Sequence, residues 1–315
     1  MNNKGLTLVE LLAVITILGI IAVIVVPRVY NYTLESNIRA LKSTYDMVVR
    51  SGERYVVDND YIYTREFGDS VEVPIRTLQD EGILSGIDSP FNDNPCSGYL
   101  LITKLTNVVD YTPMLSCEYD IDDSITDGLI GYWKLDDSVI DVSPNNNHGT
   151  FYRGLDEIDM MRDPTEGPME LSRSDQEWID FGNLRGAGIT TLSVWFNTDR
   201  TSSQYLFEGR ESGNFWFLLF YNDTDINFHN RVGYNGLELN EWYHVVVTAT
   251  SDETKLYVNG KHVDTGSGIS LNLSSLRFGT RFTNSSYFSG MINNARVYDR
   301  VLSDDEIRML YYLER

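Results

Sequence analysis

The feature that most constrains this chain is the apolar run from Leu6 to Val26, in which Glu10 is the only charged residue. A run of this length is enough to cross about 30 Å of hydrocarbon as a helix. A carboxylate at membrane depth is costly unless it has a partner. A secretory signal peptide is the simplest alternative, but Pro27 and Arg28 follow the run where a small-residue cleavage site would be needed. We therefore expect a retained membrane helix in which Glu10 has a partner.

The nearest candidate partner is the α-amino group that cleavage after Gly5 would create at Leu6. Lys4-Gly5, the following Leu-Thr-Leu-Val-Glu-Leu, the apolar run and Pro27 resemble the class III signal of type IV pilins and pseudopilins. The resemblance implies that a prepilin peptidase cuts between Gly5 and Leu6 and that Leu6 is N-methylated. It also implies that Glu10 docks each subunit near the N-terminus of a neighbour. Phenylalanine is usual at the position of Leu6, although other large apolar residues occur there.

The same resemblance implies the location and the partners of the chain. It predicts a single-pass protein of the inner or cytoplasmic membrane that later joins other pilin subunits in an extracellular pilus filament. Lys4 on the short N-terminal side agrees with the positive-inside rule. The formal net charge is −21, and both halves of the chain are acidic. A field of this sign repels polyanions, so we expect no nucleic-acid partner.

Beyond Pro27, apolar residues recur at three- and four-residue spacing and predict one stripe of a long amphipathic helix. The stripe consists of Tyr30, Leu34, Ile38, Leu41, Tyr45 and Val48. Pro27 should kink or locally melt this helix. We place a leader at residues 1–5 and the helix at 6–56, with 6–26 in the membrane or the filament core.

Short β-like runs follow the helix and are separated by turn-rich segments. They are Val71–Val73, Tyr99–Thr103 and Met114–Cys117. We therefore expect a head at residues 57–122 in which a small antiparallel sheet covers the apolar stripe of the helix. Cys96 and Cys117 bracket two of the runs, and outside the cytoplasm we predict a disulfide between them rather than two free thiols. This region has no histidine and no other cysteine, so we expect no metal site in it.

Residues 123–127 end the acidic stretch DIDDSITD and mark the predicted linker. The linker is too short for a free tether, so the two domains should lie close together. Residues 128–315 hold all five tryptophans and many short apolar runs between turns, and Asn259-Gly260 is a strong hairpin signal. These features predict an antiparallel sandwich. Ser303 and Glu306 form a capping box for a short terminal helix, whose packing face would be Ile307, Leu310 and Tyr311.

Four segments of the second domain carry a further resemblance. They read GLIGYWKLDD, TLSVWFNT, EWYHVVVTATSDETKLYVNGK and YFSGMINNARVYDRVLSDDEI. In this order they resemble the concanavalin A-like lectin/glucanase superfamily, in its laminin-G-like bacterial branch. The resemblance implies a jelly roll. The expected fold class is therefore an α+β pilin domain, a long N-terminal helix packed on a small antiparallel sheet, followed by an all-β jelly-roll sandwich.

That superfamily contains both enzymes and binding domains. Its glucanases need paired carboxylates in a Glu-x-Asp-x-x-Glu pattern on one strand, and this sequence has no such pattern. It also lacks a Ser-His-Asp grouping and a histidine-rich metal signature. We therefore favour binding over catalysis and expect no enzyme.

Laminin-G-like relatives often hold calcium, and the resemblance maps such a site onto four residues of this chain. They are Asp141, Asn146 and His148 through backbone carbonyls, and Asn293. Asn293 stands where aspartate is usual and supplies an oxygen without a charge, which calcium accepts. The alternative is that the stretch SPNNNHG is only a turn.

The expected function is that of a minor or decorated type IV pilin. It would display a lectin-like domain for attachment to a cell surface, a glycan or a matrix ligand. Tyr205, Tyr234 and Tyr287 lie in polar surroundings and are candidate sugar platforms, although ordinary packing explains them as well. Two alternatives stay open. The second domain is a spacer or subunit contact, or the chain is a pseudopilin of a secretion or DNA-uptake system.

Overall fold

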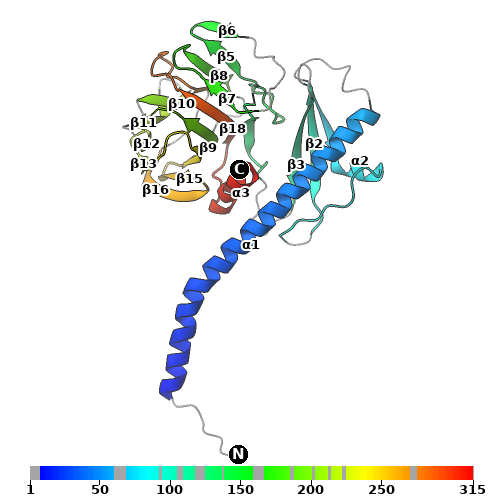
Figure 1. The fold of residues 1–315 in the computed structure, drawn as a ribbon, viewed down its shortest axis with the longest axis vertical. Helices are drawn as coiled ribbons and strands as arrows, with labels where there is room; N and C mark the ends of the chain where they lie inside the picture. Colours follow the sequence, from blue (N-terminus) through cyan, green and yellow to red (C-terminus); the bar gives the residue numbers. More distant parts are fainter. Residues whose placement is uncertain are drawn as a thin grey trace, which may run out of the picture.

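The computed structural model shows a long helix that carries two domains near its C-terminal end (Figure 1). The residues that the structure describes are 8–59, 69–91, 94–104, 109–117, 125–136, 138–158, 167–184, 188–200, 203–211, 214–221, 225–269 and 275–314. The N-terminal half of the helix extends beyond both domains (Figure 1).

Helix α1 spans Leu8–Asp58, 51 residues, close to the predicted 6–56. The helical backbone continues through Pro27, so the expected local melting does not occur there. The axis of α1 instead bends along its N-terminal half (Figure 1), as proline-containing helices do. Within the described residues, no helix is long and apolar enough to qualify as a membrane span.

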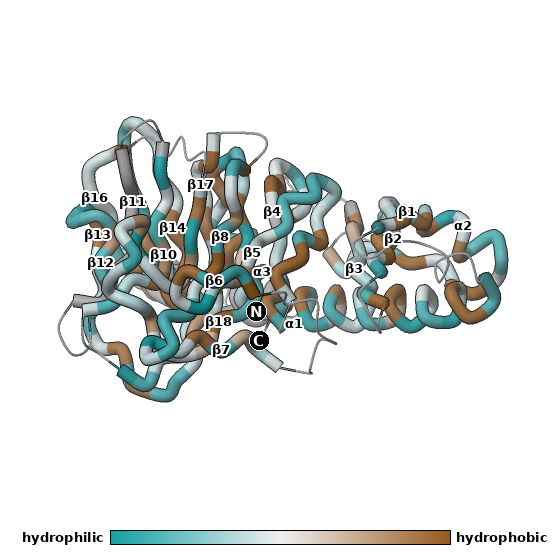
Figure 2. Tube along the Cα trace, turned by 90° about the horizontal axis from the view of Figure 1, so that it is seen from above, coloured by the Kyte–Doolittle hydropathy of each residue, from teal (hydrophilic) through white to brown (hydrophobic). Residues whose placement is uncertain are grey.

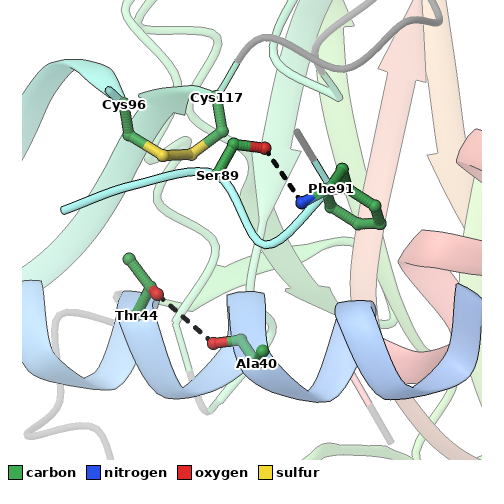
Figure 3. Close-up of a disulfide and its surroundings, with 6 residues drawn as sticks. All are labelled: Ala40, Thr44, Ser89, Phe91, Cys96 and Cys117. Carbon is green, nitrogen blue, oxygen red and sulfur yellow. Dashed lines mark hydrogen bonds between the residues drawn. A yellow bond between two sulfur atoms is a disulfide. The ribbon is translucent and has the colours of Figure 1, made fainter. Parts of the chain in front are cut away.

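The head consists of the C-terminal half of α1 and the elements β1 (Ser70–Pro74), α2 (Ile75–Asp80), β2 (Ser97–Lys104) and β3 (Val109–Ser116). The three strands form an antiparallel sheet in the order β1-β2-β3, as the sequence predicts. Val48 and Val56 of α1 pack into the same core as residues of this sheet and of α2. The predicted disulfide between Cys96 and Cys117 is formed and lies above the turn of α1 that contains Ala40 and Thr44 (Figure 3).

The second domain, which we call the sandwich, contains strands β4 to β18 and helix α3. Its first strands are β4 (Leu129–Trp133), β5 (Thr150–Arg153), β6 (Asp156–Ile158), β7 (Met169–Leu171), β8 (Glu177–Asn183), β9 (Thr191–Thr198), β10 (Gln204–Glu211) and β11 (Asn214–Tyr221). They are followed by β12 (Asp225–Phe228), β13 (Val232–Asn235), β14 (Trp242–Ala249), β15 (Glu253–Val258), β16 (Lys261–Ser267), β17 (Ser275–Phe278), β18 (Gly290–Tyr298) and α3 (Asp304–Glu314).

The strands of the sandwich form two packed antiparallel sheets. The eight-stranded sheet has the order β13-β12-β11-β10-β17-β8-β5-β6. The seven-stranded sheet has the order β16-β15-β14-β9-β18-β4, with β7 paired to β18. Buried apolar residues from both sheets form one core, and hydrophobic segments lie inside the sandwich in Figure 2. The predicted hairpin joins β15 to β16, and Asn259 and Gly260 both have the positive φ that such a turn requires.

A second core joins the sandwich to the head. It contains Ile38 and Leu41 of α1, Met114 of β3, outward-facing residues of the seven-stranded sheet, and Ile307 and Leu310 of α3. Part of the apolar stripe of α1 is therefore covered by the sandwich, and not by the head sheet alone as expected. The two domains lie side by side (Figure 2). Residues 123 and 124 of the predicted linker lie outside the described residues.

Helix α3 begins with the predicted capping box. The Ser303 N–H donates to Glu306 Oε2 at 2.7 Å, and the Glu306 N–H donates to Ser303 Oγ at 3.3 Å. Both contacts satisfy N–H groups that the first turn of a helix leaves unpaired. The cap fixes the start of α3, which packs between the seven-stranded sheet and α1.

Candidate functional site

The residues predicted for processing come just before α1 in the sequence. Gly5 and Leu6 lie outside the described residues, and the same holds for the Glu10 side chain. The exposed apolar residues nearest to them are Leu12, Val14, Ile15 and Ile17, on the part of α1 that extends away from both domains. Cleavage, methylation and the docking role of Glu10 stay predictions.

Asp141 is the centre of the predicted calcium site, and the structure surrounds its carboxylate with hydrogen-bond donors. Oδ1 accepts from the backbone N–H of Tyr132 at 2.9 Å and of Ser143 at 2.8 Å. Oδ2 accepts from the Ser143 hydroxyl at 2.9 Å and from the Asn147 N–H at 2.8 Å. Asp141 is 1% exposed. Burial raises the pKa of this carboxyl, although all four hydrogen bonds oppose the rise.

The other predicted ligands do not complete a calcium shell around Asp141. His148 Nδ1 accepts from the Asp141 N–H at 3.1 Å, and burial lowers the pKa of this imidazole. The Asn147 carbonyl, next to Asn146, accepts from the Trp133 indole at 2.8 Å. The described residues contain no group of three His, Cys, Asp or Glu side chains arranged to hold a metal. The four N–H or O–H groups directed at Asp141 form a hydrogen-bonded turn. Calcium binding at this turn stays a prediction.

Asn293, the fourth predicted ligand, lies on the outer face of the seven-stranded sheet. There it pairs in register with Trp195 of β9. The two residues line a pocket of about 420 Å³ together with Trp242, Asp136 and Glu314. This volume is within the range of about 300–1,000 Å³ that is common for small-ligand sites.

A buried ion pair lies beside this pocket. Arg296 Nε lies 2.8 Å from Glu314 Oε1, with the two side chains 9% and 4% exposed. The guanidinium also lies 3.7 Å from the centroid of the Tyr132 ring. Burial disfavours the charge on Arg296, but Glu314 and the neighbouring phenols outweigh it and raise the pKa of the guanidinium above its usual value. Burial raises the pKa of the Glu314 carboxyl, and Arg296 and the Trp195 indole oppose this rise.

The outer face of the eight-stranded sheet carries a row of aromatic and charged side chains. Tyr152 and Trp178 stack with their ring centroids 4.2 Å apart and their planes 9° apart. The Arg277 guanidinium lies 4.2 Å from the Trp178 ring and 4.3 Å from the Phe282 ring. Arg277 also pairs with Asp180 at 2.9 Å. Because α3 and the head cover the other sheet, this row is on the side of the sandwich that faces away from the head.

Two parts of the chain match known families. Residues 1–26 match the prokaryotic N-terminal methylation motif. Residues 174–308 match the concanavalin A-like lectin/glucanases superfamily. The chain joins an N-terminal methylation motif to a concanavalin A-like domain. Both resemblances drawn from the sequence are therefore confirmed, and strands β8 to β18 of the two sheets lie within the matched region.

Solved structures share less than 20% sequence identity with this chain over the region of the concanavalin A-like domain. Domain 4 of AbnA, an extracellular arabinanase from Geobacillus stearothermophilus, is 17% identical with a TM-score of 0.42, covering 57% of this chain and 96% of that chain. The receptor-binding domain of botulinum neurotoxin D is 18% identical with a TM-score of 0.43, covering 60% of this chain and 53% of that chain. This chain thus spans about half of the toxin domain. No curated protein matches this chain.

The sequence did not single out the pocket beside Asn293. Trp242 and Trp195 are read from the sequence as ordinary strand residues, because alternation shows which residues share a face but not which strands are neighbours. The sequence indicates only that Trp242 and His244, two residues apart in a strand, share one face of the sheet. Of the three tyrosines considered, Tyr287 is buried, and Tyr205 lies under the Arg281 guanidinium at 5.0 Å.

Proposed function

We propose that this chain is a prepilin-type subunit that enters an extracellular filament and presents its concanavalin A-like domain for attachment to a cell surface, a glycan or a matrix. The observation that carries the proposal is the core shared by α1 and α3. Because of it, the helix that begins with the methylation motif also holds the sandwich in a fixed position.

The N-terminal motif supports the assembly half of the proposal. Cleavage after Gly5 would free Leu6 for methylation, and Glu10 would find its partner only when a neighbouring subunit arrives. Exposed residues such as Leu12 and Ile15 lie on a helix segment that neither domain covers. That segment would be held by the membrane before assembly and by other subunits afterwards.

The arrangement of the sandwich supports the display half. The outer face of the seven-stranded sheet is partly used for docking, through Val246, Tyr257 and Tyr298. The opposite face, with Tyr152 and Trp178, is directed away from the head. A domain that is fixed on one side and open on the other is suited to present a surface outward from a filament.

A spacer or subunit contact is the main alternative, and the same shared core favours it as well. Adhesion measurements on cells that carry these filaments distinguish an adhesive domain from a spacer. Deleting the sandwich is unsuitable because it would expose Ile38 and Leu41, so a Fab against the sandwich is used instead. Adhesion should fall several-fold with this Fab, while a Fab against the head, on the β1 edge, should have little effect. Adhesion that neither Fab changes, on cells with normal filament numbers, would favour the spacer.

Replacement of Glu10 tests the assembly half separately. Glu10→Ala should leave the protein in the membrane and remove it from sheared filaments, and adhesion should fall with it. Glu10→Gln, which keeps the size of the side chain and removes the charge, should behave in the same way. Normal incorporation of both variants would contradict the proposed role of the carboxylate.

A further inference from the structure

We propose that the pocket beside Asn293 binds an uncharged sugar residue. This inference rests on the proposed adhesive function and adds to it a site and a ligand class. The pocket has a volume of about 420 Å³ and lies on the outer face of the seven-stranded sheet, at the C-terminal end of α3. Its principal side chains are Trp242, Trp195, Asn293, Asp136 and Glu314.

The floor of the pocket is formed by three adjacent strands. Trp195 of β9 pairs with His244 of β14 on one side and with Asn293 of β18 on the other. Trp242 precedes His244 by two residues, and the period of two in a strand places it on the same face. Two indoles and an amide thus converge on one hollow, with Trp195 6% exposed and Trp242 only half-buried.

Trp195 and Glu314 are held in place by surrounding contacts. The Trp195 indole N–H donates to Glu314 Oε2 at 2.8 Å, and Arg296 pairs with the other oxygen of Glu314 at 2.8 Å. The Trp195 ring also stacks on His244 and Tyr311, with centroids 5.1 and 5.5 Å away. A wall fixed in this way loses little conformational entropy when a ligand binds.

The amide of Asn293 is oriented by a chain of hydrogen bonds. The Tyr132 hydroxyl donates to Asn294 Oδ1 at 2.9 Å, and Asn294 Nδ2 donates to Asn293 Oδ1 at 2.7 Å. The Asn293 oxygen is therefore the acceptor of this chain. Within the part of the chain that the structure describes, Asn293 Nδ2 has no hydrogen-bond partner, and the same is true of the Trp242 indole N–H. The pocket consequently offers two N–H donors to a ligand.

The mixture of groups in the pocket selects for an uncharged polyhydroxylated ligand. Two N–H donors need acceptors, and the carboxylates of Asp136 and Glu314 accept from hydroxyl groups. An anionic ligand would meet the carboxylates of Asp136 and Glu314, which both line the pocket. A cationic ligand would leave both N–H donors unsatisfied, which is costly for a polar group removed from water. A sugar ring satisfies both kinds of group and can lie against the Trp242 indole.

The aromatic row on the opposite sheet is less suited to this role. Trp178 is 4% exposed, and its indole N–H already donates to the Gly154 carbonyl at 3.0 Å. Arg277 is held by Asp180 and by two aromatic rings. The donors of that row serve contacts within the protein, whereas those of Trp242 and Asn293 remain available.

The test is a glycan array probed with the full chain. The protein is kept in a detergent without a sugar head group, such as lauryldimethylamine oxide, so that the detergent does not compete. The array carries uncharged oligosaccharides, sialylated and sulfated glycans, and phosphocholine-bearing glycans. The variants are Trp242→Ala, Trp242→Phe and Asn293→Ala, with Tyr152→Ala on the opposite face as the aromatic control. Circular dichroism and thermal unfolding establish that each variant is folded.

We expect the wild type to bind uncharged glycans. Trp242→Ala should lose about 10-fold or more of this binding, as an exposed aromatic anchor does when truncated. Trp242→Phe should retain part of it, Asn293→Ala should weaken it, and Tyr152→Ala should leave it unchanged. Binding that survives Trp242→Ala but is lost in Tyr152→Ala would overturn the pocket and leave the adhesive function intact. Binding restricted to sialylated, sulfated or phosphocholine-bearing glycans would overturn the ligand class. An array without any signal, together with adhesion that the sandwich Fab blocks, would overturn the sugar site alone.

Discussion

Lys134 of the sandwich donates a hydrogen bond to Asp110 of the head, from Nζ to Oδ1 at 2.6 Å, and this ion pair joins the two domains. The same ammonium lies 3.5 Å from the Tyr111 carbonyl. Burial lowers the pKa of Lys134, but Asp110 and Tyr132 outweigh this and leave it above the usual value. The side chains of Lys134 and Asp110 are 25% and 12% exposed, so removing one partner leaves a charge largely shielded from water.

Asp110→Asn should therefore destabilise the folded chain by about 3 kcal/mol, which is the lower end of the range for breaking a buried ion pair. Denaturant unfolding of the full chain measures this. Asp80→Asn is the matched control, because Asp80 pairs with Arg76 at 3.9 Å in the same head with side chains 74% and 89% exposed. The control should change stability by less than about 0.5 kcal/mol. Equal effects of the two variants would show that the Lys134 contact does not couple the domains.

His244 predicts a dependence of stability on pH. Its ring is fully buried, with Nε2 2.8 Å from Ser193 Oγ, and burial followed by Arg296 lowers its pKa to about 3. The unfolded chain has a histidine pKa of about 6.5. The stability from His244 is therefore complete above pH 6.5 and is lost as the pH falls from 6.5 towards 3. At pH 4.5 the loss should reach about 3 kcal/mol.

The check is the free energy of unfolding between pH 7 and pH 4.5 for the wild type and for His244→Gln. The variant should lose less stability over this interval, even if it is less stable at pH 7. His262→Gln, on the exposed start of β16, is the control and should follow the wild type. If the free energy of unfolding fell equally with pH in all three proteins, the assignment of this pH dependence to His244 would be contradicted.

The sequence predicts the individual helices, strands and turns well, because each of them is determined by residues that are close together in the chain. Alternating apolar residues such as Val71 and Val73 specify strands, and Asn259-Gly260 specifies the hairpin. The capping box at Ser303 depends only on residues three apart. The Cys96–Cys117 pair follows from the compartment that the N-terminal motif implies.

The contact between the domains could not be predicted in the same way. The stripe on α1 indicates that Ile38 and Leu41 are buried, but a periodic pattern does not identify what buries them. Here it is partly α3, which lies more than 250 residues further along the chain. The pocket at Trp242 and Asn293 depends on the order β14-β9-β18, which brings together strands that are distant in sequence. Asp141 is singled out in the sequence as a calcium ligand or part of a turn, but the four donors around its carboxylate are visible only in three dimensions.

The disulfide of the head should contribute to stability by limiting the unfolded chain. Cys96 and Cys117 are 21 residues apart, and closing a loop of this size contributes about 3 kcal/mol. Replacing both cysteines with serine should lower the free energy of unfolding by about this amount. Reductant should have the same effect on the wild type and none on the double variant. Two alkylatable thiols in the untreated protein, measured by mass spectrometry, would show that the bond is absent.

The turn at Asp141 leads to a stability prediction that also tests whether calcium binds there. Asp141→Asn places an amide N–H₂ group against backbone N–H donors and should cost about 3 kcal/mol. Asp175→Asn is the control, because Asp175 accepts from the exposed Ser172 hydroxyl at 2.7 Å. If Asp141 serves only as a hydrogen-bond acceptor, calcium and chelator should leave the melting temperature of the wild type unchanged. A rise with calcium that Asp141→Asn abolishes would support the calcium prediction instead.

The central claim is that one chain is both a processed filament subunit and the carrier of the sandwich. The most direct measurement is the mass of the subunit in sheared, purified filaments, with sequencing of its N-terminal peptide. We expect a peptide that begins at N-methylated Leu6, in a chain whose mass includes the sandwich to its C-terminal end. A subunit that begins at Met1, or that is found only in the membrane fraction and never in filaments, would contradict the claim.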